Sequence, residues 1–260
     1  MLKRSPSTAV LVALLLACPA LAADRAGDLA IINTHTPKPG ADAKYETARK
    51  AHMGWHKAQK DPWSWLTWEI VSGENSGTYY TGSFGHAWKE LDGQEKLEKA
   101  DEADFAKNIG PTIARSSTAY YIHRLDLSVT QPTGDPPTAY SVLTFFLIAP
   151  DGVNDFVDAV KKINEGIKKT SYPLTGPSGM YQLVNGGEGP MFILASGRAN
   201  WAAFAAPAKT LDAMMEEAFG KDQGAAILAK GRKAIRSQRT ETIKFRPDLS
   251  YVAPKETARR

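Results

Sequence analysis

IVSGENSGTYYTGSFGHAW, at residues 70–88, is repeated in diverged form as LVNGGEGPMFILASGRANW, at residues 183–201, with a constant offset of 113. The identities that anchor the alignment include Gly73 with Gly186, Ser83 with Ser196 and Trp88 with Trp201. Self-similarity over a long period is typical of two structural units that bury surface against each other. The duplication therefore predicts the architecture before any single motif does.

A second pair of similar segments extends the duplication toward the end of each copy. LDLS at residues 125–128 corresponds to PDLS at residues 247–250, with an offset of 122. The second copy has thus gained 9 residues between the two segments, since 122 − 113 = 9. The sequence predicts two tandem repeats of similar length.

The first copy alternates between strand and helix signals. An apolar, β-branched run at 29–36 ends in turn residues, and a helical spacing of three and four runs from Asp42 to the Asp61-Pro62 pair. Aromatic and β-branched residues favour a hairpin with strands at 65–72 and 77–84. The remaining elements expected in this copy are a helix over 88–113, interrupted at Gly93 and Gly110, and a strand over 119–128.

The second copy repeats this order after a Pro- and Gly-rich segment, QPTGDPP, at residues 131–137. Its expected strands are 139–149, 179–184, 190–196 and 240–245, and its expected helices are 153–170 and 201–238. Each copy is therefore βαββαβ, or βαββα followed by an edge strand, which is the ferredoxin-like order. A single copy would leave one face of its sheet uncovered, so we predict an α+β fold in which the two ferredoxin-like repeats pack sheet to sheet.

In element order and duplication, residues 29–250 resemble the dimeric α/β-barrel superfamily, which includes antibiotic-biosynthesis monooxygenases, haem-degrading monooxygenases, chlorite dismutases and NIPSNAP-like proteins. The resemblance implies that the two repeats form within one chain the barrel that many members form as a homodimer. It also implies that haem or small aromatic substrates occupy the space between helix and sheet, with a helix-borne histidine as a haem ligand in some families. No family motif marks a ligand residue here, and the cofactor stays unknown.

The first residues predict a secretory signal peptide. Two basic residues precede an apolar run at 9–17, which is shorter than the about 20 residues that a membrane span needs. Ala20-Leu21-Ala22 has the small-x-small pattern of a cleavage site, so we expect cleavage before Ala23 and a periplasmic or secreted protein. The alternative is a lipid anchor at Cys18, against which the following Pro19 counts.

The composition excludes several kinds of site. Cys18 is the only cysteine, so the mature chain would lack disulfides and thiolate sites. The net charge is +4, and Lys and Arg are interleaved with acids, which gives no basic patch for nucleic acid. The expected division of the chain is a signal peptide at 1–22, repeat 1 at 23–130, a linker at 131–137, repeat 2 at 138–254 and a tail at 255–260.

All five histidines lie in the first copy. With local offsets of 111 and 122, four of them correspond to large apolar residues: His35 to Phe146, His52 to Ile163, His56 to Ile167 and His123 to Phe245. A buried imidazole costs about 1–3 kcal/mol for each unsatisfied group, so these replacements predict a polar ligand pocket between helix and sheet. The residues expected to line it are His35, His52, His56, His123, Tyr45 and Trp55.

His52 and His56 are four residues apart on one helical face, which is a spacing used in metal sites. HMGWH lacks the glutamate of HExxH. A three-histidine site with His35 or His123 would also lack an identifiable partner carboxylate, so no metal is assigned. The plain alternative for each histidine is a hydrogen-bonded residue of the core.

Together these features predict a secreted small-ligand-binding protein whose ligand is largely apolar or aromatic. The first alternative is an oxygenase-like enzyme, cofactor-independent or dependent on haem or metal, with a histidine as its acid or base. The second is a non-catalytic protein whose helical faces recruit a partner, which predicts exposed or internally hydrogen-bonded histidines and no cavity. The two repeats form an intramolecular pseudo-dimer in all three cases, and a further homodimer stays open.

Overall fold

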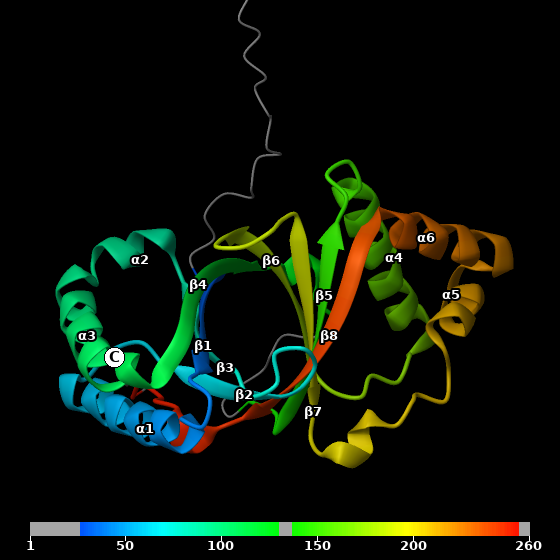
Figure 1. Ribbon diagram of the computed structural model, residues 1–260. Coiled ribbons are helices and arrows are strands. Elements are labelled where there is room, and N and C mark those ends of the chain that lie inside the picture. The colour runs from blue at the N-terminus through cyan, green and yellow to red at the C-terminus, as the bar shows by residue number, and fades with distance from the viewer. Residues whose placement is uncertain (1–26, 130–136, 255–260) are drawn as a thin grey trace, which may run out of the picture.

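The computed structural model describes residues 27–129 and 137–254, and these form a closed barrel of antiparallel strands with helices outside (Figure 1). The predicted signal peptide at 1–22, Cys18 and the tail at 255–260 lie outside the described residues, as does all of the predicted linker except Pro137. No helix in the described part of the chain is both long enough and apolar enough to cross a membrane.

Repeat 1 has the predicted order of elements. A helix with Asp42 in its first turn follows the first strand, and it ends at Lys60, whose left-handed conformation terminates the helix. The elements are β1 (Leu29–Pro37), α1 (Asp42–Gln59), β2 (Leu66–Ser72), β3 (Tyr79–His86), α2 (Trp88–Asp92), α3 (Glu95–Asn108), η1 (Gly110–Thr112), β4 (Ile113–His123) and η2 (Leu125–Leu127).

Repeat 2 follows the same order and differs mainly in its helices before the last strand. A short 3-10 helix and two α-helices occupy the region predicted as one long helix. The elements are β5 (Tyr140–Ile148), α4 (Val153–Thr170), β6 (Ser178–Asn185), β7 (Met191–Arg198), η3 (Trp201–Phe204), α5 (Leu211–Phe219), α6 (Lys221–Ala234), β8 (Ile235–Phe245) and η4 (Pro247–Leu249).

Several of the predicted boundaries are wrong. The last strand of each repeat begins earlier than expected, at Ile113 and Ile235, and the helix predicted to reach residue 238 ends at Ala234. The first halves of both strands are polar and exposed, so their composition resembles a helix surface. Strand pairing with β1 and β5 overrides that local signal.

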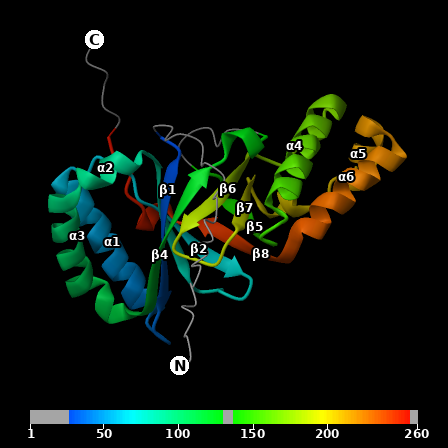
Figure 2. The same ribbon diagram turned by 90° about the horizontal axis from the view of Figure 1, so that it is seen from above.

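The barrel closes because each repeat pairs with the other at both edges of its sheet. Within the repeats the strand orders are β4-β1-β3-β2 and β8-β5-β7-β6, and the seams are β2–β8 and β4–β6. Seen from above, α1, α2 and α3 lie on one side of the barrel and α4, α5 and α6 on the opposite side (Figure 2). The predicted fold class, two ferredoxin-like repeats that form an intramolecular dimeric α/β barrel, is therefore confirmed.

The similar tails, LDLS and PDLS, fasten the seams in the same way. The Ser128 hydroxyl accepts a hydrogen bond from the backbone N–H of Met180 in repeat 2 at 2.9 Å. The Ser250 hydroxyl accepts the equivalent bond from the backbone N–H of Thr67 in repeat 1 at 2.8 Å. Each repeat thus holds an edge strand of its sister, which explains why both tails are retained.

Away from the bulges, side chains alternate between the barrel interior and the helix layers, as the pleat of a strand requires. On β7, Ile193 and Ala195 face the interior, whereas Phe192 packs outward against Phe156 of α4. On β3, Tyr80 faces the interior and Tyr79 packs outward against Tyr45 of α1. Each repeat therefore has its own helix–sheet core, and the two share one barrel interior.

Gly186 provides a test of the seam geometry. Its φ of +92° is left-handed, and a Cβ added there would lie 2.4 Å from the Thr118 carbonyl oxygen of the facing strand. We expect Gly186→Ala to lower the free energy of unfolding by about 3 kcal/mol, through backbone strain and separation of β4 from β6. Urea unfolding measures this loss.

The matched control for Gly186 is Gly40, which has a φ of +73° and nothing within 4 Å of an added Cβ. Gly40→Ala should cost only the conformational penalty of about 1 kcal/mol. Equal losses in the two variants would show that the close contact across the seam does not matter for stability.

Candidate functional site

The inner face of α1 is polar where the equivalent helix of repeat 2 is apolar. Four buried side chains at spacings of four, three and four line this face: Tyr45, Arg49, His52 and His56. At the offset of 111 their counterparts on α4 are Phe156, Val160, Ile163 and Ile167, which pack into the apolar cores of repeat 2. A helix face with this spacing points into one layer, so repeat 1 has replaced part of its core with polar groups.

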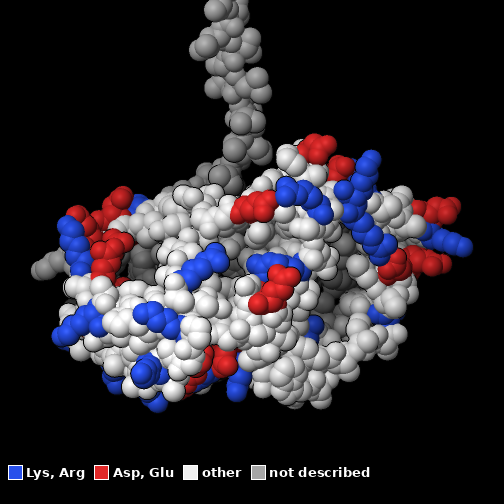
Figure 3. Space-filling view, viewed as in Figure 1, with Lys and Arg blue, Asp and Glu red and all other residues white. Residues whose placement is uncertain are grey.

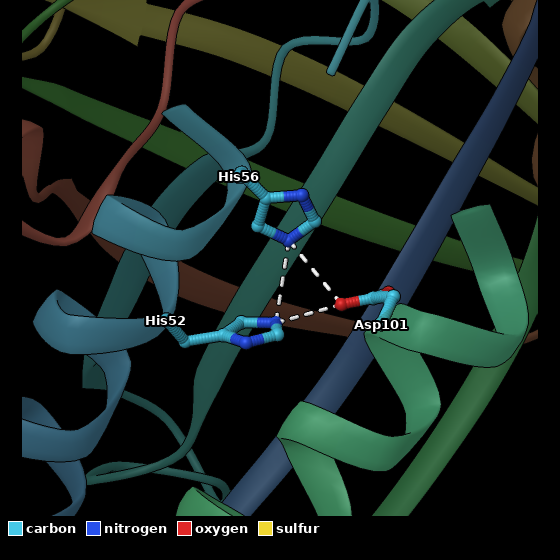
Figure 4. Close-up of side chains that lie close together, drawn as sticks. All are labelled: His52, His56 and Asp101. Carbon is cyan, nitrogen blue, oxygen red and sulfur yellow. Dashed lines mark hydrogen bonds and ion pairs between the residues drawn. The ribbon is translucent and has the colours of Figure 1, made fainter. Parts of the chain in front are cut away.

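His52 and His56 on α1 and Asp101 on α3 point toward one another (Figure 4). The two Nε2 atoms lie 3.2 Å apart. Asp101 Oδ1 lies 3.0 Å from Nε2 of His52 and 3.4 Å from Nε2 of His56. Both rings are buried, whereas the Asp101 side chain is 30% exposed. The three atoms form a compact triangle close to the surface between the two helices.

The other nitrogen of each ring contacts a further carboxylate. His52 Nδ1 lies 2.7 Å from Asp104 Oδ2, and His56 Nδ1 lies 2.7 Å from Asp61 Oδ2. Asp61 also accepts hydrogen bonds from the Trp65 indole and the Trp63 backbone N–H. Burial raises the pKa of Asp61, but the bonds from His56, Trp63 and Trp65 outweigh it and leave that pKa below its ordinary value.

His35 lies deeper in the same layer, between β1 and the helices. Its Nδ1 is 3.1 Å from the hydroxyl of Tyr45, and its ring is 5.2 Å from that of Phe105. Burial, with the nearby charges of Arg49 and His52, lowers the pKa of His35 to about 3. His35 is therefore neutral at physiological pH and serves as a hydrogen-bonded residue of the core.

Arg49 is a buried cation with few partners. Its side chain is 3% exposed, and its Nη2 is 3.4 Å from the Thr67 hydroxyl. Its Nε makes no hydrogen bond with any described residue. Burial lowers the pKa of the guanidinium, and the charge of Asp101 opposes that shift. Asp101 on α3 therefore lies near a cation as well as two imidazoles.

The layer between α1 and the sheet does not fit a haem, the cofactor that the family resemblance implies. Tyr45 and Ile109 are completely buried there, and Phe105 packs against both His35 and His52. The Nε2 atoms of His52 and His56 face each other and Asp101 rather than an apolar slot. A flat macrocycle would have to displace this packed layer.

The large cavity lies inside the barrel instead. It has a volume of about 750 Å³ and is lined by the inward-facing side chains of both repeats. Trp68 contacts Phe84 edge to face at 6.0 Å, and Phe84 in turn contacts Tyr181 at 6.2 Å. Other apolar residues of the wall are Ile32, Leu66, Leu143, Phe145, Leu183, Ile193 and Ile243.

Polar groups gather on one part of this wall, around the buried carboxylate of Glu241. Tyr80 donates a hydrogen bond to it at 2.7 Å, Asn75 donates another at 2.6 Å, and Arg239 forms an ion pair with it. The Arg239 guanidinium also lies 3.6 Å from the centroid of the Phe145 ring. Burial and the charge of Glu241 raise the pKa of Tyr80.

His123 is the one predicted site histidine that reaches the cavity wall. Its ring stacks on Tyr181 with centroids 4.7 Å apart, and its Nε2 lies 3.3 Å from the Ser128 hydroxyl. Burial lowers the pKa of His123, although the charge of Asp28 opposes the shift. A neutral imidazole in such a position can accept a proton.

The predicted site residues thus do not share one pocket. His52 and His56 converge with Asp101, and Trp55 stacks on His52 with ring centroids 5.8 Å apart. His35 and Tyr45 pair in the core, and His123 lies in the barrel cavity on the other side of the sheet. The pocket expected between helix and sheet is therefore replaced by a packed polar layer and a separate cavity.

Sequence reasoning missed the acids that complete the histidine cluster. Asp101 and Asp104 carry no motif that singles them out in the sequence, and Asp61 entered the sequence-based interpretation only through the Asp61-Pro62 pair that ends a helix. The i,i+3 spacing of Asp101 and Asp104, which places both on one side of α3, was the available signal. Arg49 was also missed, although it continues the face of α1 that carries His52 and His56.

His35 makes stability depend on pH. Because its folded pKa is about 3 and its unfolded pKa is about 6.5, the unfolded chain binds the extra proton, and stability falls as pH drops below 6.5. His35→Phe, which copies Phe146 of repeat 2, should remove about 2 kcal/mol of the stability loss between pH 6.5 and 4.5. Urea unfolding across this range measures the difference, and identical slopes in both proteins would contradict it.

Comparisons with known proteins find similarity in structure but not in sequence. No family model matches the chain, and no curated protein matches it. A putative monooxygenase from Lactobacillus acidophilus has 12% identity and a TM-score of 0.53, over 87% of this chain and 97% of that one. An anthrone oxidase-like protein has 16% identity and a TM-score of 0.52, over 90% and 97%.

A chlorite dismutase variant from Candidatus Nitrospira defluvii has 9% identity and a TM-score of 0.54, over 86% of this chain and 93% of that one. At such low identity these likenesses concern the fold alone, and they cover both repeats. The shared fold thus extends over most of the closed barrel. The chain has the fold of the dimeric α/β-barrel superfamily.

Proposed function

We propose that this protein binds a small, largely aromatic or apolar molecule inside its barrel. The observation that carries the proposal is the cavity of about 750 Å³, which is enclosed by strands of both repeats. Small-molecule sites are usually preformed, of about 300–1,000 Å³, and apolar with a few convergent polar groups. The barrel interior has this character, with Trp68, Phe84 and Tyr181 on its wall.

The polar part of the wall favours a ligand with an acidic or phenolic group. Arg239 is partly neutralised by Glu241, but it is 40% exposed, and it lines the cavity. Arg115 also lines the cavity and forms no ion pair within the described part of the chain. Two guanidinium groups on the wall of a largely apolar cavity would attract and orient an anionic oxygen.

The alternative of a pure interaction protein is less well supported. This alternative predicts internally hydrogen-bonded histidines, and His35 and His56 are hydrogen-bonded in this way. It does not account for a large preformed cavity. The face shown in Figure 3 has basic and acidic side chains interspersed, without a broad area of one sign that would favour a highly charged partner.

A second candidate is an oxygenase-like enzyme built on the same cavity. Its support is the neutral His123 on the wall, together with the names monooxygenase and anthrone oxidase-like among the structural neighbours. In this version, His123 accepts a proton from an acidic C–H or O–H of the bound molecule before that molecule reacts with dioxygen. Ser128 holds the imidazole in place.

We further propose that the protein is exported, on the support of the basic, apolar and small-residue pattern at residues 1–22. A barrel without cysteines fits an oxidising compartment, because no thiol within it could form a wrong disulfide. The mass of the protein recovered from the producing cell tests the proposed cleavage before Ala23.

Binding of 1-naphthoate, followed by isothermal titration calorimetry, tests the leading proposal. We expect saturable binding, and Arg239→Gln should weaken it about tenfold, which corresponds to about 1.4 kcal/mol. Binding of the uncharged analogue 1-naphthalenemethanol should change little. Ala195→Trp, which fills the cavity from β7, should abolish binding of both compounds.

The control for Arg239 is Arg236→Gln on the same strand. Arg236 pairs with Glu188 on the surface and does not line the cavity. It should leave naphthoate binding unchanged. Undiminished binding in Ala195→Trp, or equal weakening in the two arginine variants, would place the ligand elsewhere.

The enzyme candidate has its own test in His123→Phe, which copies Phe245 of repeat 2. With anthrone as the probe, oxygen consumption should fall by at least about 100-fold in the variant, the usual contribution of a general base. Binding of naphthoate should persist. Oxygen consumption that is undetectable in the unaltered protein, or equal in both, rejects the catalytic version and leaves ligand binding standing.

A further inference from the structure

The convergence of His52, His56 and Asp101 is unusual because it brings together three acceptor atoms. The two Nδ1 atoms lie at 2.7 Å from the carboxylates of Asp104 and Asp61. An ionised carboxylate only accepts hydrogen bonds, so each Nδ1 carries the hydrogen that it donates. In a neutral imidazole, the Nε2 atom then presents a lone pair.

Asp101 adds a third acceptor to this pair of lone pairs. Its Oδ1 is buried, and no described donor is aligned to form a hydrogen bond with it, although two ring nitrogens lie within 3.4 Å. The 3.2 Å contact between the two Nε2 atoms can be a hydrogen bond only if one ring also carries a hydrogen on Nε2. With both Nδ1 hydrogens directed at the outer carboxylates, a cation shared by the two Nε2 atoms and Asp101 Oδ1 would satisfy all three acceptors. Figure 4 shows that all three atoms point at one place between α1 and α3.

The distances suit a metal ion. Zinc binds histidine nitrogens and carboxylate oxygens at about 2.0–2.2 Å, so two ligands in a tetrahedron are about 3.4 Å apart, and two adjacent ligands in an octahedron are about 3.0 Å apart. The three separations here are 3.2 Å, 3.0 Å and 3.4 Å. The three ligand atoms are thus already spaced as they would be around one ion.

The outer carboxylates have the arrangement that metal sites require. Ligand histidines almost always donate their second N–H to a carboxylate, a carbonyl or a water, which fixes the ring and raises its basicity. Asp104 and Asp61 do this for His52 and His56, and Asp61 is itself fixed by the Trp65 indole at 2.9 Å. The carboxylates whose absence argued against a metal in the sequence are therefore present in the fold.

Repeat 2 provides an internal comparison. The counterparts of His52 and His56 are Ile163 and Ile167, which pack against the buried Met214 and Met215. A helix of this type in this fold is thus stable with aliphatic side chains at both positions. The polar cluster of repeat 1 serves something other than packing.

We propose that His52, His56 and Asp101 form a binding site for a divalent first-row transition-metal ion. Two imidazoles and one carboxylate favour zinc or iron(II) over the softer copper(I) and over magnesium and calcium, which prefer oxygen ligands alone. Three protein ligands leave at least one coordination position for water or a small ligand, and the partial exposure of Asp101 gives access from solvent.

The site is separate from the proposed ligand cavity. His52, His56 and Asp101 lie in the helix layer outside the sheet, whereas Arg239 and Ala195 face the barrel interior. Loss of metal binding at the histidine cluster would therefore not imply loss of small-molecule binding in the barrel cavity, and the reverse also holds. Arg239→Gln and Ala195→Trp should leave metal affinity unchanged.

Zinc titration of the chelator-treated mature protein, by calorimetry, tests the proposal. We expect one saturable zinc ion per chain, and a visible ligand-field band when cobalt(II) replaces zinc. His52→Ile with His56→Ile, which copies repeat 2, should abolish both signals. Asp101→Asn should weaken zinc binding at least about tenfold, and Asp104→Asn should weaken it by about 10- to 100-fold through the orientation of His52.

Glu102→Gln is the matched control for Asp101→Asn, because Glu102 is an exposed acid next to it on α3. It should bind zinc as the unaltered protein does. Circular dichroism confirms that each variant is folded, and the isoleucine pair is expected to fold because the sister helix carries the same residues. Absence of saturable zinc binding, or equal affinity in Asp101→Asn and Glu102→Gln, would overturn the proposal.

Discussion

Strand exchange between the two repeats is the constraint on which this molecule depends. The seams β2–β8 and β4–β6 give each four-stranded sheet partners at both of its edges, so no exposed edge is left in the barrel. The hydroxyls of Ser128 and Ser250 then fasten each tail to the other repeat. Neither repeat alone could shield the inner face of its sheet from solvent, because that face is enclosed only when the two sheets close into a barrel.

Closure divides the protein into three chemically different spaces. The interior is a largely apolar cavity with Arg239 and Tyr80 on its wall, both bound to the buried Glu241. The helix layer of repeat 2 is an apolar core around Phe156 and Phe192, whereas that of repeat 1 contains buried ionisable groups such as Arg49. Since repeat 2 packs the equivalent helix face with apolar side chains alone, the polar layer of repeat 1 is a specialised feature of one half of a symmetrical fold.

Much of this could be predicted from the repeated sequence. Helix α4 was predicted with its observed bounds, and the interruption at Gly93 separates α2 from α3 as expected. The last strands were placed too late because their exposed residues resemble a helix surface, and only pairing with β1 and β5 defines them. A local sequence pattern indicates which face of a strand is buried, but it does not indicate which other strand pairs with it.

The sequence by itself determined the duplication, the order of elements and the presence of histidines where the sister repeat has Ile or Phe. It could not determine where those histidines point. The partner of His52 is 52 residues away on another helix, and its approach depends on how α1 and α3 are rotated and packed on the sheet. His123 and His35 are separated by the sheet itself, because neighbouring strands present them on opposite faces. Whether two side chains that are far apart in the sequence point toward each other depends on how their helices and strands pack. Only the tertiary structure therefore decided which polar residues meet.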